Sequence, residues 1–408
     1  MRKRGGNKNM SQIVIAGSEK LKRSLNFQLV VFVIGRLIFN TFYRSIYPFL
    51  SVIAKGLGVD LQTISYAITA RSAIGVGGPF LASVADNKGR KTGMLVGTAI
   101  YTLAICLIVI WPTFPIFFLA LSLAFIGYLI FVPSMQAYLG DQVPYEKRGR
   151  VLGITEFSWS LSAIFGVSLV GLIIARNGWL APFPLIAFLG GLTVLALVWM
   201  LPRDPARQAG VPGFWINFRA VFSYPPAIAA LIMAALYTAA NETVTLVYGV
   251  WVEQSFALSI SSLGATALLI GIAELGGESL VTAFTDRIGK RKAIAIGLIG
   301  NCLASLALPL LGRWLPGALV SLFLFYITFE FTIVSGIPLM SEILPSSRAT
   351  MLASHMSLLA IGRAVGDLVA PKLFTLTILP EITANAAAAI FFNVLAIIAL
   401  TQIKISQK

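Results

Sequence analysis

Charged residues are scarce in this chain: they make up 12% of its 408 residues, whereas hydrophobic residues make up 57%. A soluble globular protein carries about 25% charged residues, so the composition argues against a soluble fold. The apolar residues gather in runs that approach or exceed roughly 20 residues, the length that a helix needs to cross the hydrocarbon core of a membrane. The sequence therefore predicts an integral, multi-pass membrane protein.

Cysteine and histidine are nearly absent. The two cysteines, Cys106 and Cys302, both fall inside apolar runs, where we expect small buried hydrophobes and neither a disulfide framework nor a metal site. The single histidine, His355, is expected to be a hydrogen-bonded structural residue. No Walker-type phosphate loop, metal-ligand pattern or nucleophile pattern occurs. The sequence predicts no cofactor, no metal and no enzymatic activity.

Acidic residues are half as frequent as basic ones, and the net charge is +15. The basic residues lie in short clusters between apolar runs and form no face interleaved with aromatics, so no nucleic-acid partner is expected. Twenty-three Lys and Arg residues fall in the loops of one side of the membrane and four in those of the other. By the positive-inside rule, both termini lie in the cytoplasm, with the protein in the plasma (inner) membrane, and the number of spans is even.

Twelve transmembrane helices are predicted, in two groups of six. The spans are at 27–52, 62–85, 93–111, 115–139, 151–174, 181–201, 227–251, 263–285, 293–312, 317–340, 350–374 and 384–402. The organisation is a cytoplasmic basic arm (1–26), a six-helix bundle (27–201), a cytoplasmic linker (202–226), a second six-helix bundle (227–402) and a cytoplasmic tail (403–408). Residues 214–218 of the linker either lie along the membrane interface as an amphipathic segment or are plain linker.

Two loop motifs occur twice. The loop after the second span contains Asp86, Gly89, Arg90 and Lys91, and the loop after the eighth span contains Asp286, Gly289, Lys290 and Arg291, 200 residues further on. A second pair, Asp141-x-x-Pro144 and Glu342-x-x-Pro345, follows the fourth and tenth spans at nearly the same offset. Two matching motifs at one offset indicate two duplicated halves, and parallel repeats of this kind are a transporter architecture.

In these motifs the chain resembles the major facilitator superfamily over essentially its whole length. The family's signature loop is roughly G-x-L-[AS]-D-R-x-G-R-[KR]. The N-terminal copy has Asn87 where the first Arg is usual, and the leading Gly is replaced by Ala82 and Thr282. The resemblance implies an all-α membrane fold with two pseudo-symmetric six-helix bundles. The central cavity between the bundles would open alternately to the two sides of the membrane.

The loop motif also has a physical interpretation of its own. An Asp at a helix end needs a donor, which a helix N-terminus can supply, and Gly allows a tight turn. Such charges can latch the two halves together on the cytoplasmic side in one state and release them in another. The alternative is that the cations only set topology. The predicted gating residues are Asp86, Gly89, Arg90, Lys91, Asp286, Arg287, Gly289, Lys290 and Arg291.

Ten ionisable residues fall inside the predicted spans, although a charge at mid-depth of a bilayer costs about 2.5–3.5 kcal/mol on insertion scales. Such side chains must face a cavity or one another. On the first span, Arg36, Asn40, Tyr43, Arg44 and Tyr47 fall within an arc of roughly 100°. The N-terminal half supplies mainly arginines and the C-terminal half mainly glutamates. The predicted substrate- and ion-binding residues of a central cavity are Arg36, Asn40, Arg44, Arg71, Glu242, Glu274, Glu330 and Arg363.

For three other acidic residues a structural or coupling role is at least as well supported. Glu156 is placed to anchor the basic loop around Arg148. Glu278 is placed to pair with a cation of the motif loop, and Asp367 lies one helical turn from Arg363, where the two charges can neutralise each other.

The functional prediction is a secondary transporter. A carboxylate in a low-dielectric cavity can titrate near neutral pH, so Glu242, Glu274 and Glu330 are candidate proton carriers, whereas Arg cannot be deprotonated. We expect a proton-coupled monomer, in contact with membrane lipids, that moves a small anionic or amphiphilic solute. Export is slightly favoured, although the fifth span lacks the Pro of the family's antiporter pattern. The alternatives are an ion-independent uniporter, a lipid or amphiphile transporter, and a membrane ligand sensor that does not transport.

Overall fold

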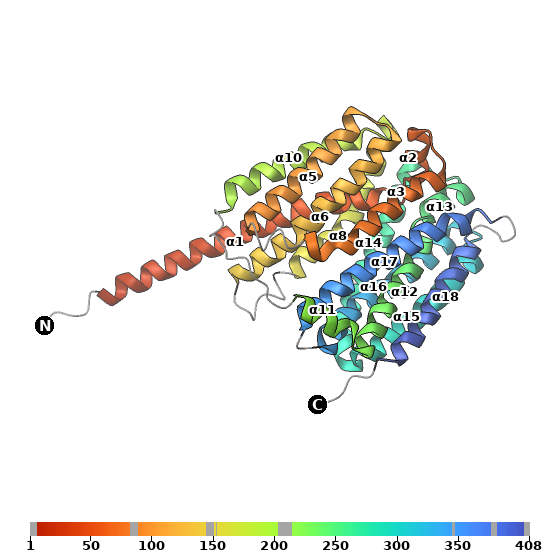
Figure 1. Ribbon diagram of the computed structural model, residues 1–408. Helices are drawn as coiled ribbons and strands as arrows, with labels where there is room; N and C mark the ends of the chain where they lie inside the picture. The colour runs from red at the N-terminus through yellow and green to blue at the C-terminus, as the bar shows by residue number, and fades with distance from the viewer. Residues whose placement is uncertain are drawn as a thin grey trace.

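All regular structure in the described part of the chain is helical (Figure 1). The computed structural model describes residues 6–81, 89–143, 151, 153–202, 214–344, 347–376 and 382–403. Within these residues, eleven helices are long and apolar enough to cross a membrane. At the position of the second predicted span, α3 (Leu61–Ile74) continues through a 3-10 turn, η1 (Gly75–Gly77), into helical residues up to Leu81. The predicted all-α, multi-pass architecture is therefore confirmed.

The N-terminal half contains six spans. The first is formed by α1 and α2, the second by α3 with η1, and the fifth contains a π-helical turn, η2. The bounds of the remaining elements are α1 (Gly6–Ser45), α2 (Leu50–Leu57), α5 (Arg90–Ile110), α6 (Phe114–Gln142), α8 (Ser158–Leu161), η2 (Ser162–Val167), α9 (Ser168–Asn177) and α10 (Pro182–Met200).

The C-terminal half begins with a short helix in the linker and continues with six spans. The linker helix includes residues 214–218, which the sequence left open between an interfacial segment and plain linker. The bounds are α11 (Phe214–Phe222), α12 (Pro225–Thr245), α13 (Tyr248–Phe256), α14 (Ile260–Ile288), α15 (Lys290–Leu311), α16 (Leu315–Ile343), α17 (Arg348–Phe374) and α18 (Thr383–Thr401).

The helices repeat along the chain with the spacing of the loop motifs. α1 ends at Ser45 and its counterpart α12 ends at Thr245. α5 begins at Arg90 and its counterpart α15 begins at Lys290. α6 and α16 begin 201 residues apart, at Phe114 and Leu315. The first and seventh spans, predicted at 27–52 and 227–251, are each interrupted and then resume as α2 and α13. In the first span Pro48 lies in this break, where its missing N–H removes one helical hydrogen bond.

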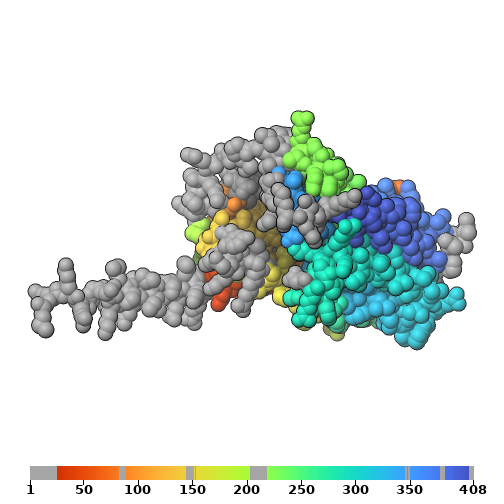
Figure 2. Space-filling view, turned by 90° about the horizontal axis from the view of Figure 1, so that it is seen from below, coloured from red at the N-terminus to blue at the C-terminus, as the bar shows by residue number. Residues whose placement is uncertain are grey.

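The two halves pack side by side along the fifth and eighth spans and along the second and eleventh. α14 packs against η2 and α9, and α3 packs against α17. Figure 1 shows α5, α6 and α10 in one group and α12, α15 and α18 in the other. In the space-filling view of Figure 2, the yellow part of the N-terminal half lies directly against the blue-green C-terminal half.

Large apolar side chains cover the outer surface of both groups. Leu103 and Trp199 of the N-terminal half are 64% and 81% exposed, and Leu303 and Phe391 of the C-terminal half are 64% and 59% exposed. An apolar surface of this extent would be an aggregation site in water, whereas hydrocarbon is its natural solvent. Because polar and charged groups are turned inward in the same helices, the fold is the arrangement expected of a membrane protein.

The first residues of α1 and the last residues of α18 lie at one end of the molecule (Figure 1), called here the terminal end. At the opposite, distal end the two halves are in close contact. A Cβ added to Gly249 of α13 would lie 2.6 Å from Pro48 Cα, and one added to Gly171 of α9 would lie 3.1 Å from Gly264 Cα of α14. In addition, Ser51 of α2 donates a hydrogen bond to Glu253 of α13. The distal end is closed.

Candidate functional site

The eight residues predicted to line a central cavity all point into the interior. Six of them are at most 8% exposed, and the side chains of Arg44 and Arg363 are 10% and 25% exposed. They come from α1 (Arg36, Asn40, Arg44), α3 (Arg71), α12 (Glu242), α14 (Glu274), α16 (Glu330) and α17 (Arg363). Six helices of both halves therefore bring these charges inside, and none of them faces the outer apolar surface.

Arg36 forms an ion pair inside the N-terminal half. Its Nη1 and Nη2 atoms donate to the two carboxylate oxygens of Glu156, at 2.6 and 2.5 Å, which is the bidentate geometry of a strong charge-assisted pair. Nη1 also donates to Thr155 Oγ1, and Gln136 Nε2 donates to Glu156. The expected contact of Glu156 with the loop around Arg148 lies outside the described residues; the structure assigns this carboxylate to Arg36.

Arg44 and Glu274 form an ion pair between the two halves. Arg44 Nη2 lies 2.8 Å from Glu274 Oε2, with both side chains at most 10% exposed. The indole of Trp159 joins them, because its ring lies 4.5 Å from the Arg44 guanidinium and its Nε1 donates to Glu274 Oε1 at 3.4 Å. Trp159 was not predicted, although its position three residues after Glu156 places it on the same helical face.

Two further acidic groups are held near the contact between the second and eleventh spans. Arg363 Nε lies 3.4 Å from Glu242 Oε1, and Asp367 accepts a hydrogen bond from Ser72 Oγ of the other half at 2.6 Å. Arg363 and Asp367 still interact electrostatically over a longer distance, but the ion pair of Arg363 is with Glu242.

Glu278, which the sequence placed near the motif-loop cations, instead accepts a hydrogen bond from Ser160 of α8 at 3.3 Å. This contact joins the eighth span to the fifth, so it connects the two halves. The structure therefore gives Glu278 a partner in the opposite bundle.

Arg71 and Glu330 are the two predicted site residues that have a charge but no ion pair among the described residues. Arg71 donates from Nη2 to Tyr47 Oη at 2.8 Å, and its guanidinium lies 4.0 Å from the centre of the Tyr43 ring. Its Nε and Nη1 atoms are buried without a hydrogen-bond partner. Glu330 packs against Gly277 of α14 and lies within electrostatic range of Glu274, Glu278 and Arg44.

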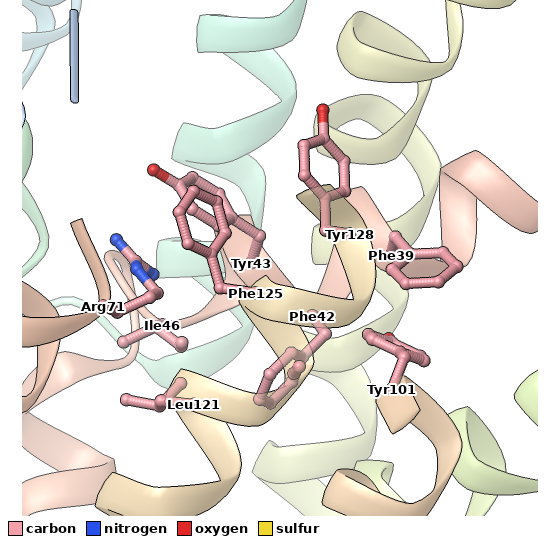
Figure 3. Close-up of a pocket in the computed structure, with 10 residues that line it drawn as sticks. Phe39, Phe42, Tyr43, Ile46, Arg71, Tyr101, Leu121, Phe125 and Tyr128 are labelled. Atoms are coloured by element: carbon pink, nitrogen blue, oxygen red, sulfur yellow. The ribbon is translucent and has the colours of Figure 1, made fainter. Parts of the chain in front are cut away.

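A small cavity lies beside Arg71, as Figure 3 shows. Its volume is about 10 Å³, enough for about one water molecule. Of the predicted site residues, Arg71 alone lines it; five of the others are held in ion pairs, namely Arg36, Arg44, Glu242, Glu274 and Arg363. The lining residues are Phe39, Phe42, Tyr43, Ile46, Arg71, Tyr101, Leu121, Ala124, Phe125 and Tyr128.

The predicted gating motif is partly described. Asp86 lies in the undescribed segment 82–88, and the side chain of Asp286 is likewise outside the description. Gly89 and Gly289 directly precede α5 and α15 as their N-caps, with φ of 98° and 88°, a backbone conformation that glycine adopts without strain. The positive φ at both glycines is what the predicted tight turn requires, and the turn itself stays a prediction.

The basic residues that follow each of these glycines contact their own half of the protein. Arg90 pairs with Asp141 at 3.5 Å, and Lys290 pairs with Glu342. Lys91 donates to the carbonyl oxygens of Val198 and Leu201, and Arg291 donates to that of Thr401. The first copy therefore connects the start of α5 to the ends of the fourth and sixth spans. The second copy connects the start of α15 to the ends of the tenth and twelfth spans. Arg287 is exposed, and the gating role of the motif stays a prediction.

Other sequence expectations concern structural residues. His355 is fully buried and its Nε2 shares a hydrogen bond with Tyr237 Oη at 3.1 Å, as expected of a structural histidine. Cys106 and Cys302 are both free thiols. In the described segments, no group of three or more His, Cys, Asp or Glu side chains is placed to hold a metal ion.

Two helical bundles that enclose paired charges, with one end closed, define a membrane carrier. The chain belongs to the Major Facilitator Superfamily, whose sequence model matches residues 32–366. It is therefore a transporter and not an enzyme.

Among curated relatives, the chain is 25% identical over 363 residues to the uncharacterized MFS-type transporter YceJ of Bacillus subtilis (strain 168), covering 86% of this chain and 89% of YceJ. A shorter match to YwfA of the same organism is 33% identical over 123 residues and covers 30% of each chain. A citrate-proton symporter of Klebsiella pneumoniae (26% identity, 66% of each chain) and a PmrA-homologous multi-drug resistance efflux pump of Lactococcus lactis (20%, 68% of this chain and 71% of the pump) are also similar.

Solved transporters share the fold at low sequence identity. A D-xylose-proton symporter superposes with a TM-score of 0.73 at 16% identity, covering 91% of this chain and 95% of the symporter. A peptide transporter superposes with a TM-score of 0.74 at 12% identity, covering 92% of this chain and 94% of the other. The predicted fold class is confirmed by these superpositions.

Proposed function

We propose that this chain is a proton-coupled secondary carrier that moves a small anionic or amphiphilic solute by alternating access, with export favoured. The observation that carries the proposal is the position of Glu330. This carboxyl group is 8% exposed and has no ion pair among the described residues, and it lies within electrostatic range of the Arg44–Glu274 pair that joins the two halves.

Glu330 is suited to bind and release a proton. An ionised carboxylate that is buried without a counter-charge is unfavourable, and the neighbouring carboxylates of Glu274 and Glu278 add repulsion. Protonation removes both effects. An ionised Glu330 competes with Glu274 for the Arg44 guanidinium, whereas a neutral Glu330 does not. Proton binding therefore favours the arrangement in which the Arg44–Glu274 pair holds the two halves together.

The closed distal end and the charge of the loops together predict which side of the membrane is shut in this structure. If the terminal end is cytoplasmic, as the excess of Lys and Arg predicts, the closed end faces outward and the carrier is captured in a state closed to the outside. A solute taken up from the cytoplasm would be released after the distal contacts open. The similarity to a multi-drug efflux pump supports export, and the similarity to a citrate-proton symporter supports proton coupling.

The test is a flux measurement on Glu330→Gln in proteoliposomes. A thermal-shift screen of metabolites and drugs first identifies a solute that stabilises the purified protein. Flux of that solute is then measured with and without a pH gradient. We expect the gradient to drive wild-type flux, and Glu330→Gln to lose the gradient-driven part, by about tenfold or more, because the amide cannot carry a proton. Solute exchange without a gradient is expected to remain.

Asp60→Asn is the matched control. Asp60 is the N-cap of α3 and accepts a hydrogen bond from the Thr63 amide at 2.7 Å, and hydrogen bonds from Thr63 hold the pKa of its carboxyl below the ordinary value. Asn is an equally good N-cap, so this carboxyl-to-amide change should leave gradient-driven flux intact. Equal pH dependence of wild type and Glu330→Gln would contradict proton coupling through Glu330.

A second candidate, transport of a lipid or amphiphile, is favoured by an apolar space of about 80 Å³ between α1, α9 and α10. Leu169 and Leu185 in its lining are 50% and 39% exposed, so it is accessible from the outer apolar surface. Movement of fluorescent-headgroup lipid between the leaflets of protein-containing vesicles would support this candidate over a water-soluble solute. Binding of a ligand without any flux would instead support a membrane sensor.

A further inference from the structure

We propose that Arg71 and the aromatic side chains beside it form the substrate subsite, and that the substrate is a planar aromatic anion such as an aryl carboxylate. This proposal rests on the transport function above and adds the chemical class of the solute. Arg71 is 1% exposed and has two guanidinium nitrogens without a hydrogen-bond partner in the described part of the chain. It also lines the small cavity shown in Figure 3.

The Arg71 guanidinium favours an anionic ligand, because its positive charge is permanent and two of its nitrogens have no hydrogen-bond partner in the described part of the chain. Arg cannot lose its proton inside a protein, and a buried donor without an acceptor is unfavourable. Asp367 and Glu242 interact electrostatically with Arg71, but Asp367 accepts a hydrogen bond from Ser72 and Glu242 pairs with Arg363. A ligand carboxylate at Arg71 would supply acceptors for the two unpartnered guanidinium nitrogens.

The aromatic side chains around Arg71 favour a ligand with an aromatic ring next to its anionic group. The Tyr43 ring lies 4.0 Å from the Arg71 guanidinium and 5.8 Å from the Phe125 ring. Phe125 is in turn stacked on Tyr128, with an interplanar angle of 7°. Figure 3 shows Arg71 beside the rings of Tyr43 and Phe125. Offset stacking on such rings favours a flat aromatic body over a branched aliphatic one.

The amount of space limits the ligand to a small one. The cavity beside Arg71 has a volume of about 10 Å³, which is room for about one water molecule. An anionic group can enter this space directly, whereas a ring attached to it enters only when the side chains of the wall move apart, so a single ring is favoured over a larger body. A cation with the same ring is disfavoured because Arg71 would repel it.

The experiment uses benzoate, benzylammonium and acetate as probes with the full-length protein in lipid nanodiscs, by titration calorimetry. Benzoate and benzylammonium share a ring and differ in charge, and acetate has the charge without the ring. We expect benzoate to bind more tightly than either. Arg71→Gln should bind benzoate about 10- to 100-fold more weakly, the ratio expected when a charged hydrogen-bonding group is removed. Arg176→Gln and Arg313→Gln, at the distal ends of spans, should bind as wild type does.

Two further variants keep the test decisive if Arg71→Gln fails to fold. Arg71→Lys retains the charge but not the planar fork, and should weaken benzoate binding while leaving some preference over benzylammonium. Phe125→Leu should weaken benzoate more than acetate, because it removes a ring contact and no charge. Absence of benzoate binding to the folded wild type, preference for benzylammonium, or unchanged affinity in Arg71→Lys and Phe125→Leu would each overturn the proposal.

Flux measurements separate this subsite from the transport function. If benzoate binds through Arg71 but a pH gradient does not drive its transport, the proposal for the subsite is supported and the proposal of a proton-coupled carrier is contradicted. If a pH gradient drives the flux of a cationic solute and benzoate does not bind, the proposal of a proton-coupled carrier is supported and the proposal for the subsite is overturned.

Discussion

At the scale of single residues, the interior of this protein is organised by matched charges. Bringing a charge into a low-dielectric interior is costly, and a partner of opposite sign at hydrogen-bond distance offsets that cost only in good geometry. Arg36 has Glu156, Arg44 has Glu274 and Arg363 has Glu242. Among the described residues, Arg71 and Glu330 are left without an ion pair, as are Glu278 and Asp367, which accept hydrogen bonds from Ser160 and Ser72. Of these, we assign the ligand to Arg71 and the proton to Glu330.

The Arg44–Glu274 pair gives a prediction for stability. Arg44→Gln or Glu274→Gln alone should lower the free energy of unfolding by about 3–5 kcal/mol, because each leaves a buried charge without its partner. The double variant Arg44→Gln with Glu274→Gln should be more stable than either single variant. Thermal unfolding of the purified protein, followed by light scattering, measures all three.

Lys55→Gln is the control for this cycle. Lys55 lies 3.7 Å from Glu253, but its side chain is 78% exposed, and an exposed pair contributes about 0–1 kcal/mol. The Lys55→Gln variant should therefore have nearly the same unfolding temperature as the wild type. Additive effects in the Arg44–Glu274 double variant would show that the two groups do not act as a pair.

At the scale of helices, the two halves use corresponding residues in corresponding ways. Arg90–Asp141 in the first half is matched by Lys290–Glu342 in the second, and the contact of Lys91 with the end of α10 is matched by that of Arg291 with the end of α18. Since these contacts stay inside each bundle, the motif in this structure braces the bundle ends on the terminal side.

The fifth span differs from its neighbours because it contains the π-helical turn η2, an uncommon element that often occurs at functional positions. At this turn a Cβ on Gly166 would lie 2.0 Å from Thr41 Oγ1, and a Cβ on Gly271 of α14 would lie 3.0 Å from Ala163 Cβ. Helices of both bundles thus approach the turn closely. Glu156, Trp159 and Ser160, which make polar contacts with α1 and α14, precede it directly.

The close contact at Gly249 gives a prediction for the distal closure. In Gly249→Ala the new Cβ would lie 2.6–2.8 Å from backbone atoms of Tyr47 and Pro48, and overpacking of this kind costs about 1–3 kcal/mol. The cost falls on the state in which the distal ends touch, so the variant should populate the distally open state more. The measurement is labelling of a cysteine at Ala54, which is 5% exposed, by a membrane-impermeant maleimide, with Cys106 and Cys302 replaced by Ala.

Gly191→Ala is the matched control, since Gly191 lies within α10 and a Cβ there would meet no atom within 4 Å. It should label at the wild-type rate. Unchanged labelling in Gly249→Ala would mean that the contact with Pro48 does not limit opening of the distal end.

At the scale of the whole molecule, the unequal distribution of positive charge predicts the orientation. Both termini and the terminal end should lie in the cytoplasm. A green fluorescent protein fused to the C-terminus should fluoresce, and a cysteine placed at Gly58, in the distal loop after α2, should react with an impermeant reagent added to intact cells. A cysteine at Gly289, on the terminal side, should react only after the membrane is opened. The reverse labelling pattern would place the closed distal end on the cytoplasmic side.

The boundaries of the two six-helix units, the monomeric state and the proton coupling also remain predictions at this scale. Mass photometry in nanodiscs tests the monomer. The contacts between halves at the distal end predict that each unit alone would expose the glycine and serine surfaces that now face the other half.

The sequence by itself determined the membrane location, the helical spans, the duplication and the set of charges that lie inside. Long apolar runs have no stable alternative to transmembrane helices, and a charge within such a run must turn inward. These are local properties of composition and spacing. For the same reason the turn glycines at Gly89 and Gly289 could be predicted from two short motifs.

Only the tertiary structure decided which charges are paired and which remain free. Coulomb attraction and hydrogen bonding act over a few ångströms, and the partners are far apart in the sequence: Arg36 and Glu156 are 120 residues apart, and Arg44 and Glu274 are in different halves. The aromatic wall at Arg71 likewise brings together side chains of α1, α3 and α6. It is made by contacts between helices, which no single stretch of the chain contains.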